Sequence, residues 1–265
     1  MSGAEENEPG APGAGAAGDS DAVGETDTVG DSDAVDTDAV DSDASFQELL
    51  RGLRVRHGGE LPVLDPDMAP DAPLPLFRRW LREAAGSDEP AAHTMMLATA
   101  GADGRPSQRT VMLHGADARG WHFGTHRTSR KGRELAERPY ASLAFHWPRT
   151  GRQVRIGGRV HEAGAEESAA DLRGRSPAAL AAALAGAGRQ SEVLGSYQEL
   201  VRAFEAAYER AEREPDATAP SWTLYVLEPD EVEFYQEEAR RRHVRVRYRR
   251  APEEPGGWRR ELLWP

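Results

Sequence analysis

The sequence predicts an antiparallel β-barrel with peripheral helices, a mainly β fold of the α+β type, over residues 45–265. Two observations carry this prediction. Short β-prone runs dominate the chain, and helical segments interrupt them without a regular strand–helix–strand alternation, which argues against a doubly wound sheet. The chain also has no Gly-x-Gly-x-x-Gly, P-loop, His-Glu-x-x-His or Gly-x-Ser-x-Gly motif, so side chains on the barrel would have to hold any phosphorylated ligand.

Periodicity and turn residues place the individual elements. Leu76, Phe77, Trp80, Leu81 and Ala84 recur at helical spacing, and Gly86 ends that helix. Alternating or β-branched runs, bounded by turns such as Asp103-Gly104, predict strands at 94–100, 107–113, 120–125, 140–147, 153–162, 222–227, 232–236 and 243–249. Helices are also expected at 129–137, 166–173, 177–185 and 197–213, and Gly256-Gly257 predicts a final turn.

Residues 1–44 form a separate region by composition. They hold thirteen Asp and Glu residues and no Lys or Arg, and they are rich in Gly, Ala, Asp and Ser. Such a segment buries too little apolar surface to offset its ordering entropy, so we predict a disordered acidic tail. The near-repeat that begins at Asp31 lacks the glycine and terminal glutamate of an EF-hand loop, which favours a solvating role over calcium binding, and no metal site is predicted.

The charge of the remaining chain is nearly balanced. Residues 45–265 contain 32 of the 45 acidic residues and all 33 Lys and Arg, so we expect no nucleic-acid partner. The absence of cysteine excludes disulfides, thiolate metal sites and cysteine nucleophiles, and it fits a cytoplasmic protein. No apolar run approaches the length of a membrane span and residues 1–23 lack the features of a secretion signal, so no membrane association is expected.

One cluster of basic residues predicts an anion site. Arg109 lies in one strand-like run, the next run ends at Thr125, and a helix then begins with Ser129-Arg130-Lys131. Cations in a first helical turn oppose the helix dipole, whereas the free N–H groups there attract anions. The arrangement is favourable if a phosphate lies among Arg109, Arg130, Lys131 and those N–H groups, although a solvated Arg-rich helix start has the same pattern.

From Phe46 to Pro265 the chain resembles the pyridoxine/pyridoxamine 5′-phosphate oxidase family, flavin enzymes built on a split β-barrel. The matching motifs keep the family's order: Arg109-x-Val-x-Leu, Ser129-Arg-Lys, Arg152-Gln-Val, Gln190-Ser, Phe234-Tyr-Gln and Arg241-x-His. The resemblance implies that Arg109, Arg130 and Lys131 contact the phosphate of FMN and that Thr125, which closes the next strand, also belongs to the cofactor site. Paired cations of this kind suit a phosphate dianion.

The resemblance also implies which residues lie near the flavin ring. Gln153 matches a glutamine beside the ring, Tyr235 stands where the family has tryptophan, and Arg245 follows the Arg-x-His motif. Amide donors and an arginine there would stabilise the negative charge of a reduced flavin. Gln190 and Ser191 match a pair that reaches FMN from the partner subunit, so the resemblance implies a homodimer with FMN at the interface and a C-terminal dimerisation segment.

The substrate pocket departs from the family's pattern. His114 stands where the phosphate oxidases have lysine, while Asp171, Arg175 and Ala179 stand where they have tyrosine, arginine and serine. Only the arginine of the substrate-phosphate grip therefore remains, which should weaken phosphate binding by several kcal/mol, at roughly 1.5–3 kcal/mol per charged hydrogen bond. The N-terminal Arg-x-x-Tyr of the vitamin enzymes is also missing from this chain.

These departures are similar to those of the flavin oxidases of phenazine biosynthesis. We expect an FMN-dependent oxidase in which a planar amine or reduced heterocycle passes a hydride to flavin N5 and dioxygen reoxidises the flavin to give hydrogen peroxide, with a lean towards a phenazine-type substrate. Arg241 and His243 would orient the substrate, with His243 or His114 as proton acceptor. The alternatives are an oxidase that makes pyridoxal 5′-phosphate, a non-catalytic flavin-binding split barrel, and a deazaflavin reductase.

Overall fold

The computed structural model describes residues 43–53 and 60–265. The chain divides into two units, Met1–Leu53 and Arg54–Pro265. In the first unit the described part contains one helix, α2 (Asp43–Gly52), with Phe46, Leu49 and Leu50 exposed. This helix was not among the predicted elements, and it begins inside the segment expected to be a disordered tail. The rest of that expectation, for residues 1–42, lies outside the described residues.

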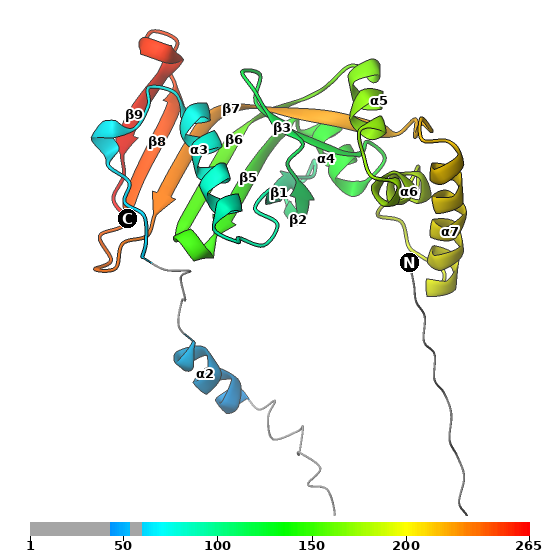
Figure 1. The fold of residues 1–265 in the computed structure, drawn as a ribbon, viewed down its shortest axis with the longest axis horizontal. Helices are drawn as coiled ribbons and strands as arrows, with labels where there is room; N and C mark the ends of the chain where they lie inside the picture. Colours follow the sequence, from blue (N-terminus) through cyan, green and yellow to red (C-terminus); the bar gives the residue numbers. More distant parts are fainter. Residues whose placement is uncertain (1–42, 54–59) are drawn as a thin grey trace, which may run out of the picture. The chain divides into compact units, whose positions relative to one another are not determined.

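The second unit is built on one antiparallel sheet that curls into a split barrel (Figure 1). The strand order is β2-β1-β5-β6-β7-β4-β3, with β8 paired to β7 and β9 paired to β8. The antiparallel barrel with peripheral helices is thus confirmed. The strands are β1 (Thr94–Ala100), β2 (Pro106–Met112), β3 (Gly115–Ala116), β4 (Trp121–His126), β5 (Tyr140–Trp147), β6 (Arg152–Glu162), β7 (Trp222–Gln236), β8 (Val244–Arg250) and β9 (Trp258–Leu262).

The long strand β7 connects the two parts of the sheet. Its first half pairs with β4, its second half pairs with β8, and β6 runs beside both halves. The sequence predicted two separate strands here, and that was wrong. The β6–β7 register shifts between Gly157 and Gly158, next to Pro229. Such an irregularity accommodates a proline, which has no N–H for the ladder, so the strand continues through it.

Two short strands, β3 and β9, were not predicted. Strand β9 lies at the edge of the sheet, and its Arg259 and Arg260 are exposed, so it shows no alternation of apolar and polar residues. Pairing with β8 defines it instead, supported by the ion pair between Arg247 and Glu261 (2.7 Å). The predicted turn before it is confirmed, because Gly256 and Gly257 both have positive φ (72° and 75°).

The helices of the second unit lie close to their predicted positions. They are α3 (Pro73–Gly86), α4 (Arg130–Glu137), α5 (Ala165–Arg173), α6 (Pro177–Ala185) and α7 (Tyr197–Arg213), with 3-10 turns at Pro66–Met68, Pro148–Thr150 and Pro255–Gly257. Helix α6 starts with a proline at N1 and is capped by Ser176, and α7 is capped by Ser196. None of the helices in the described ranges is both long enough and apolar enough to cross a membrane.

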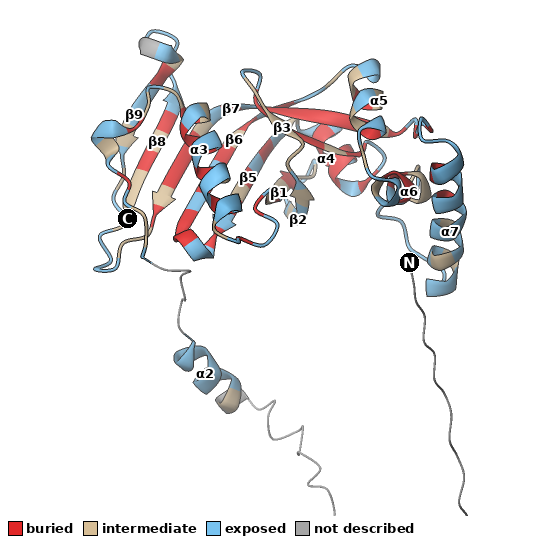
Figure 2. Ribbon diagram, in the orientation of Figure 1, coloured by how far each residue is buried: buried red, intermediate tan, exposed pale blue. Residues whose placement is uncertain are grey.

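The main core lies between α3 and the sheet (Figures 1 and 2). Phe77 of α3 makes edge contacts with Trp121 and Phe145, and Trp80 makes one with Phe234, with ring centroids 5.1–5.2 Å apart. A second apolar cluster joins α5, α6 and α7 through Leu172, Leu180, Ala181, Ala183, Ala207, Ala211 and Ala219. The small residues of this cluster allow the three helices to approach one another closely. Much of the surface of α7 is nevertheless exposed (Figure 2).

Candidate cofactor and substrate site

The start of α4 brings together the basic residues that the sequence singled out. Ser129 caps the helix by accepting from the N–H of Gly132, so Arg130 and Lys131 occupy the first turn. A Cβ on Gly132 would lie 2.3 Å from the carbonyl oxygen of Arg127, which means that only glycine permits this tight entry into the helix. We call Arg109, Thr125, Arg130, Lys131, Gln190 and Ser191 the phosphate cluster.

Lys131 is the buried member of the phosphate cluster, with 8% of the residue exposed. Its Nζ donates to Thr125 Oγ1 and to Gln190 Oε1, both at 3.1 Å. Within the described residues no carboxylate lies at ion-pair distance from this ammonium group. Burial and, to a smaller extent, the charge of Arg109 lower the pKa of Lys131 to about 8. A buried ammonium that donates its hydrogen bonds to neutral side chains is a place where an anion would be stabilised.

Glu134 is a member of this site that was not among the predicted site residues. Its carboxylate accepts from Thr99 (2.5 Å) and Ser107 (2.6 Å) and forms ion pairs with Arg109 (3.3 Å) and Arg130 (2.8 Å). Burial alone would raise the pKa of Glu134, but these hydrogen bonds lower it to about 2. The i,i+4 spacing of Arg130 and Glu134 on one helix was the available signal.

Gln190 and Ser191 contact the phosphate cluster of their own chain. Gln190 Oε1 accepts from Lys131, and the N–H of Arg130 donates to Ser191 Oγ at 3.2 Å. The expectation that this pair reaches the site from the partner subunit therefore needs correction. The loop between α6 and α7 folds back over the start of α4, and Ser191 adopts a left-handed conformation there (φ 77°). Such strained residues cluster at binding sites.

The residues expected near the flavin ring form a separate group. Gln153 of β6 lies opposite Tyr235 of β7, which lies opposite Arg245 of β8, so the three side chains form a row across neighbouring strands. They line a cavity of about 240 Å³ together with Arg155, Glu233 and Pro265. Arg245 is held by Glu233 (2.8 Å) and donates to the carbonyl oxygen of Trp264 (2.8 Å). We call Gln153, Tyr235 and Arg245 the ring cluster.

Arg241 and His243 adjoin the ring cluster from the loop between β7 and β8. The His243 ring lies 5.3 Å from the ring of Tyr235, and its Nδ1 accepts from the N–H of Glu238 at 3.1 Å. A neutral imidazole that accepts through Nδ1 carries its proton on Nε2. Arg241 is exposed and has a left-handed backbone conformation (φ 61°).

The residues that replace the family's substrate-phosphate grip meet in one place, which we call the substrate corner: His114, Asp171, Arg175 and Trp222. Asp171 lies 2.9 Å from His114 Nδ1, accepts from the indole N–H of Trp222 at 2.9 Å and pairs with Arg175 at 3.4 Å. Arg175 also contacts both ring nitrogens of His114 and stacks on Trp222.

Asp171 supplies the negative charge that faces Arg175 in the substrate corner. Burial alone would raise the pKa of Asp171, but the hydrogen bond from His114 and the charges of His114 and Arg175 lower it, so its carboxylate is ionised. Ala179, the fourth aligned position, lies in the first turn of α6 and adds no polar side chain. Trp222 is a member that the sequence did not indicate, because it comes from the start of β7, more than forty residues beyond Arg175.

The phosphate and ring clusters lie at opposite ends of the long strand β7. Thr223 of β7 pairs with Thr125, whereas Tyr235 belongs to the ring cluster. The twelve residue steps from Thr223 to Tyr235 correspond to roughly 40 Å of strand at about 3.3 Å per residue. One FMN molecule is much shorter than this distance. The two clusters therefore lie at opposite ends of a strand that is longer than one FMN molecule.

Two family models match the second unit. Residues 82–211 match the model described as pyridoxamine 5′-phosphate oxidase. Residues 222–265 match the model described as the pyridoxine 5′-phosphate oxidase C-terminal dimerisation region.

Curated relatives share this family's name over nearly their whole length. A pyridoxine/pyridoxamine 5′-phosphate oxidase of Burkholderia multivorans is 43% identical over 216 residues, which cover 82% of this chain and 99% of the relative. The enzyme of the same name from Salinibacter ruber is 40% identical over 203 residues, which cover 76% of this chain and 93% of the relative.

Solved structures support the fold. PhzG from Burkholderia lata 383, in complex with tetrahydrophenazine-1-carboxylic acid, has a TM-score of 0.70 and 34% identity, covering 78% of this chain and all of that chain (100%). A pyridoxamine 5′-phosphate oxidase-related, FMN-binding protein from Nostoc punctiforme has a TM-score of 0.59 at 20% identity, covering 76% of this chain and 100% of that chain. The second likeness bears on the fold alone.

Proposed function

Because this chain belongs to the pyridoxamine 5′-phosphate oxidase family, we propose that it is an FMN-dependent oxidase of a planar, reduced heterocycle that carries no phosphate. The substrate corner is the observation that supports a substrate without a phosphate group. Arg175, the cation that remains of the phosphate grip, is already paired with Asp171 of its own chain. A substrate phosphate would have to displace that carboxylate and face its charge in a mostly buried place.

The phosphate cluster fits the phosphate of FMN. Arg109, Arg130 and Lys131 carry three positive charges and Glu134 carries one negative charge, which leaves two positive charges for a phosphate dianion. Lys131 Nζ, the backbone N–H groups at the start of α4 and the hydroxyl groups of Thr125 and Ser191 supply donors of the type that phosphate needs. The residues present thus suit this cofactor.

We propose a homodimer in which each FMN lies between the phosphate cluster of one copy and the ring cluster of the other. The separation of the two clusters along β7 supports this arrangement, as does the match of residues 222–265 to a dimerisation region. In the assembled site Gln153 and Arg245 would donate hydrogen bonds at the ring, and Tyr235 would pack beside it.

The bound FMN would supply the redox chemistry, taking a hydride from the substrate at N5 and passing electrons to dioxygen to give hydrogen peroxide. Arg241 and His243 would orient the substrate over the ring. The tautomer of His243 makes its Nε2–H a hydrogen-bond donor. Both ring nitrogens of His114 are engaged by Asp171 and Arg175, so we assign His114 to substrate selection. A cytoplasmic location stays a prediction from the lack of cysteine.

The second candidate is an oxidase of pyridoxamine 5′-phosphate, favoured by the 43% identity to a relative of that name. Anaerobic mixing separates the two functions. The purified yellow protein is reduced with pyridoxamine 5′-phosphate or with tetrahydrophenazine-1-carboxylic acid, and bleaching of the flavin absorbance is followed. We expect rapid bleaching by the phenazine compound and slow bleaching by the phosphate ester. The reverse result would establish the second candidate.

A variant that restores the family's substrate-phosphate site provides a second test. His114→Lys, Asp171→Tyr and Ala179→Ser together restore the family's residues, and the variant should gain at least about tenfold in its rate with pyridoxamine 5′-phosphate at low concentration, since each charged hydrogen bond contributes roughly 1.5–3 kcal/mol. The matched control is Asp117→Asn, which removes another Asp–His pair (His122, 3.1 Å) outside the substrate corner. A phosphate-ester rate that responds equally to both changes would contradict the role of the corner.

A further inference from the structure

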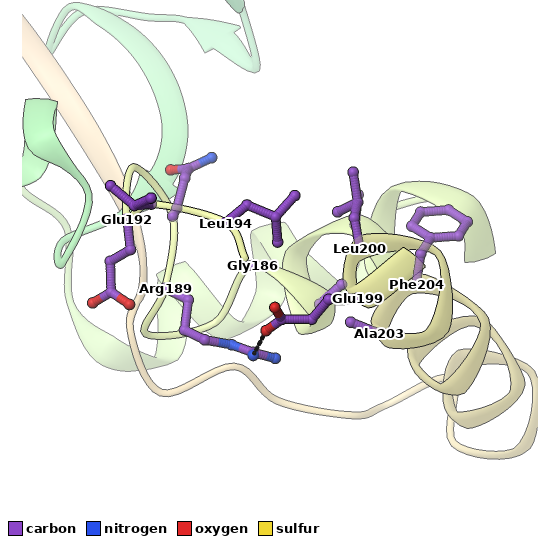
Figure 3. Close-up of a pocket in the computed structure, with 12 residues that line it drawn as sticks. Gly186, Arg189, Glu192, Leu194, Glu199, Leu200, Ala203 and Phe204 are labelled. Atoms are coloured by element: carbon purple, nitrogen blue, oxygen red, sulfur yellow. Dashed lines mark ion pairs between the residues drawn. The ribbon is translucent and has the colours of Figure 1, made fainter. Parts of the chain in front are cut away.

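An apolar groove opens between α6, α7 and the loop that joins them (Figure 3). Its volume is about 360 Å³, and Val193, Leu194, Leu200 and Phe204 line it. The ion pair between Arg189 and Glu199 (3.5 Å) lies at its edge. The groove is therefore apolar inside and has charged residues beside it, which is the pattern of a surface that binds another apolar group.

The side chains of this groove are exposed in the single chain. Val193 is fully exposed (100%), and Leu194, Leu200 and Phe204 are 47%, 45% and 38% exposed. Tyr197, Leu200, Phe204 and Tyr208 follow one another at helical spacing, so the apolar surface continues along one face of α7. An apolar face of this extent on a polar helix indicates a contact with another molecule.

The groove adjoins the phosphate cluster through Gln190. This residue lines the groove and also accepts a hydrogen bond from Lys131. Whatever lies in the groove is thus next to the end of the site where the cofactor phosphate would bind.

A second exposed apolar segment adjoins the ring cluster. The C-terminal segment, residues 262–265, includes Leu262 (65% exposed) and Trp264 (92% exposed). Its backbone is fixed to the ring cluster, because Arg245 donates to the carbonyl oxygen of Trp264 and Pro265 lines the same cavity as Gln153. The indole, in contrast, extends into solvent.

We infer that the indole of Trp264 from one copy of this chain binds in the α6–α7 groove of a second copy. The inference rests on the proposed function, in which one FMN spans the phosphate cluster of one copy and the ring cluster of the other. That arrangement brings the groove and the C-terminal segment to the same cofactor from opposite copies. The groove has room for an indole, and in a closed two-fold dimer the contact forms twice.

The contact couples assembly to cofactor binding. The α6–α7 loop carries Gln190 and Ser191 to the phosphate cluster, and the partner's indole packs against the next residues of that loop, Val193 and Leu194. Docking therefore holds the loop in the conformation that completes the phosphate cluster.

The absence of cysteine allows a direct test on the FMN-loaded protein. In the double variant Val193→Cys/Trp264→Cys, oxidation should give a covalent dimer on a non-reducing gel, because disulfides form only between residues whose Cα atoms approach within about 7 Å. The control Val63→Cys/Trp264→Cys uses another exposed valine (90%), outside the groove, and should remain monomeric on the gel. A monomer with an internal disulfide in the test variant would overturn the inference.

A second measurement does not depend on disulfide geometry. Trp264→Ala should raise the dimer dissociation constant by roughly 30-fold or more, as for an aromatic anchor at the centre of an interface, and Trp264→Phe should restore most of the affinity. Val63→Ala should change nothing. A Trp264→Ala dimer with unchanged affinity and full FMN content would overturn this inference and leave the proposed function intact. A wild-type chain that neither dimerises nor binds FMN would overturn both.

Discussion

The phosphate cluster and the substrate corner both hold a mostly buried cation, yet they differ in the carboxylate that the chain provides. In the phosphate cluster Glu134 pairs with Arg109 and Arg130, whereas Lys131 donates to the neutral side chains of Thr125 and Gln190. In the substrate corner Arg175 is matched by Asp171. A basic residue therefore predicts an anion-binding site only when no carboxylate of the same chain already pairs with it. An arginine or lysine in a complete ion pair gains little stabilisation from a further anion.

The largest change in affinity is expected when two basic side chains of the phosphate cluster are removed. Arg130→Ala/Lys131→Ala should weaken FMN binding by roughly 1000-fold, since two charged hydrogen-bond donors are lost at about 1.5–3 kcal/mol each. The barrel should stay folded, because both side chains lie at the helix start and outside the main core. Flavin content after gel filtration and the circular dichroism spectrum measure the two quantities.

Two control variants make that test specific. Arg133→Ala changes an exposed arginine of the same helix and should leave FMN bound. Arg175→Ala removes the cation of the substrate corner and should also leave FMN bound. Stoichiometric flavin in the double variant would refute the role of the phosphate cluster, and flavin loss in Arg175→Ala would remove the distinction between the two regions.

The next two predictions concern the carboxylates of the two regions, Glu134 and Asp171. Glu134→Gln should lower the unfolding free energy of the apoprotein by about 2 kcal/mol, because the variant loses charged hydrogen bonds in a buried place. Addition of FMN should restore that stability, since the cofactor phosphate replaces the lost negative charge. Thermal unfolding with and without FMN provides the measurement.

Asp171→Asn gives the contrasting case in the substrate corner. It should destabilise the chain by a similar amount, and FMN should not restore the loss, whereas inorganic phosphate should. Rescue of both variants by FMN alone would mean that the two regions form one anion site.

The smallest effect is the pH dependence of FMN binding. The pKa of Lys131 is lowered by burial to about 8, below its value in the unfolded chain, so raising the pH from 7 to 9 removes its proton in the folded apoprotein. The FMN dissociation constant should therefore rise about tenfold over this range, since the phosphate stays a dianion throughout. In Lys131→Arg the dissociation constant should be flat over the same range. Fluorescence titration of FMN measures both.

The lowered pKa of Lys131 also determines whether the unfolding free energy rises or falls with pH. Because the folded-state pKa lies below the unfolded one, the apoprotein should become more stable as the pH rises above about 8 towards 10.5, by up to about 3 kcal/mol from this group. A stability that falls across this window in the wild type but not in Lys131→Arg would contradict the buried, unpaired state of the ammonium group.

Local pattern was sufficient for most of the secondary structure. The alternation in 94–100 and 140–147, the helical spacing in 197–213 and the run of strong helix formers in 177–185 gave β1, β5, α7 and α6 with their observed bounds. Strands β1 and β5 and helix α7 contact the rest of the protein with one regular face, so their period identifies them, whereas α6 is identified by its Ala and Leu residues. In contrast, β9 and the continuous β7 depend on a neighbouring strand, and the chain itself carries no local signal for that pairing.

Local sequence pattern predicted most of the elements, the basic start of α4 and the motifs that place this chain in its family. Only the tertiary structure decided which charges are left without a partner. Glu134 meets Thr99 and Ser107 from another strand pair, Asp171 meets Trp222 from beyond α7, and β7 holds the two halves of the cofactor site far apart. The physical reason is that electrostatic and hydrogen-bond partners are chosen by distance in space, whereas periodicity acts along the chain.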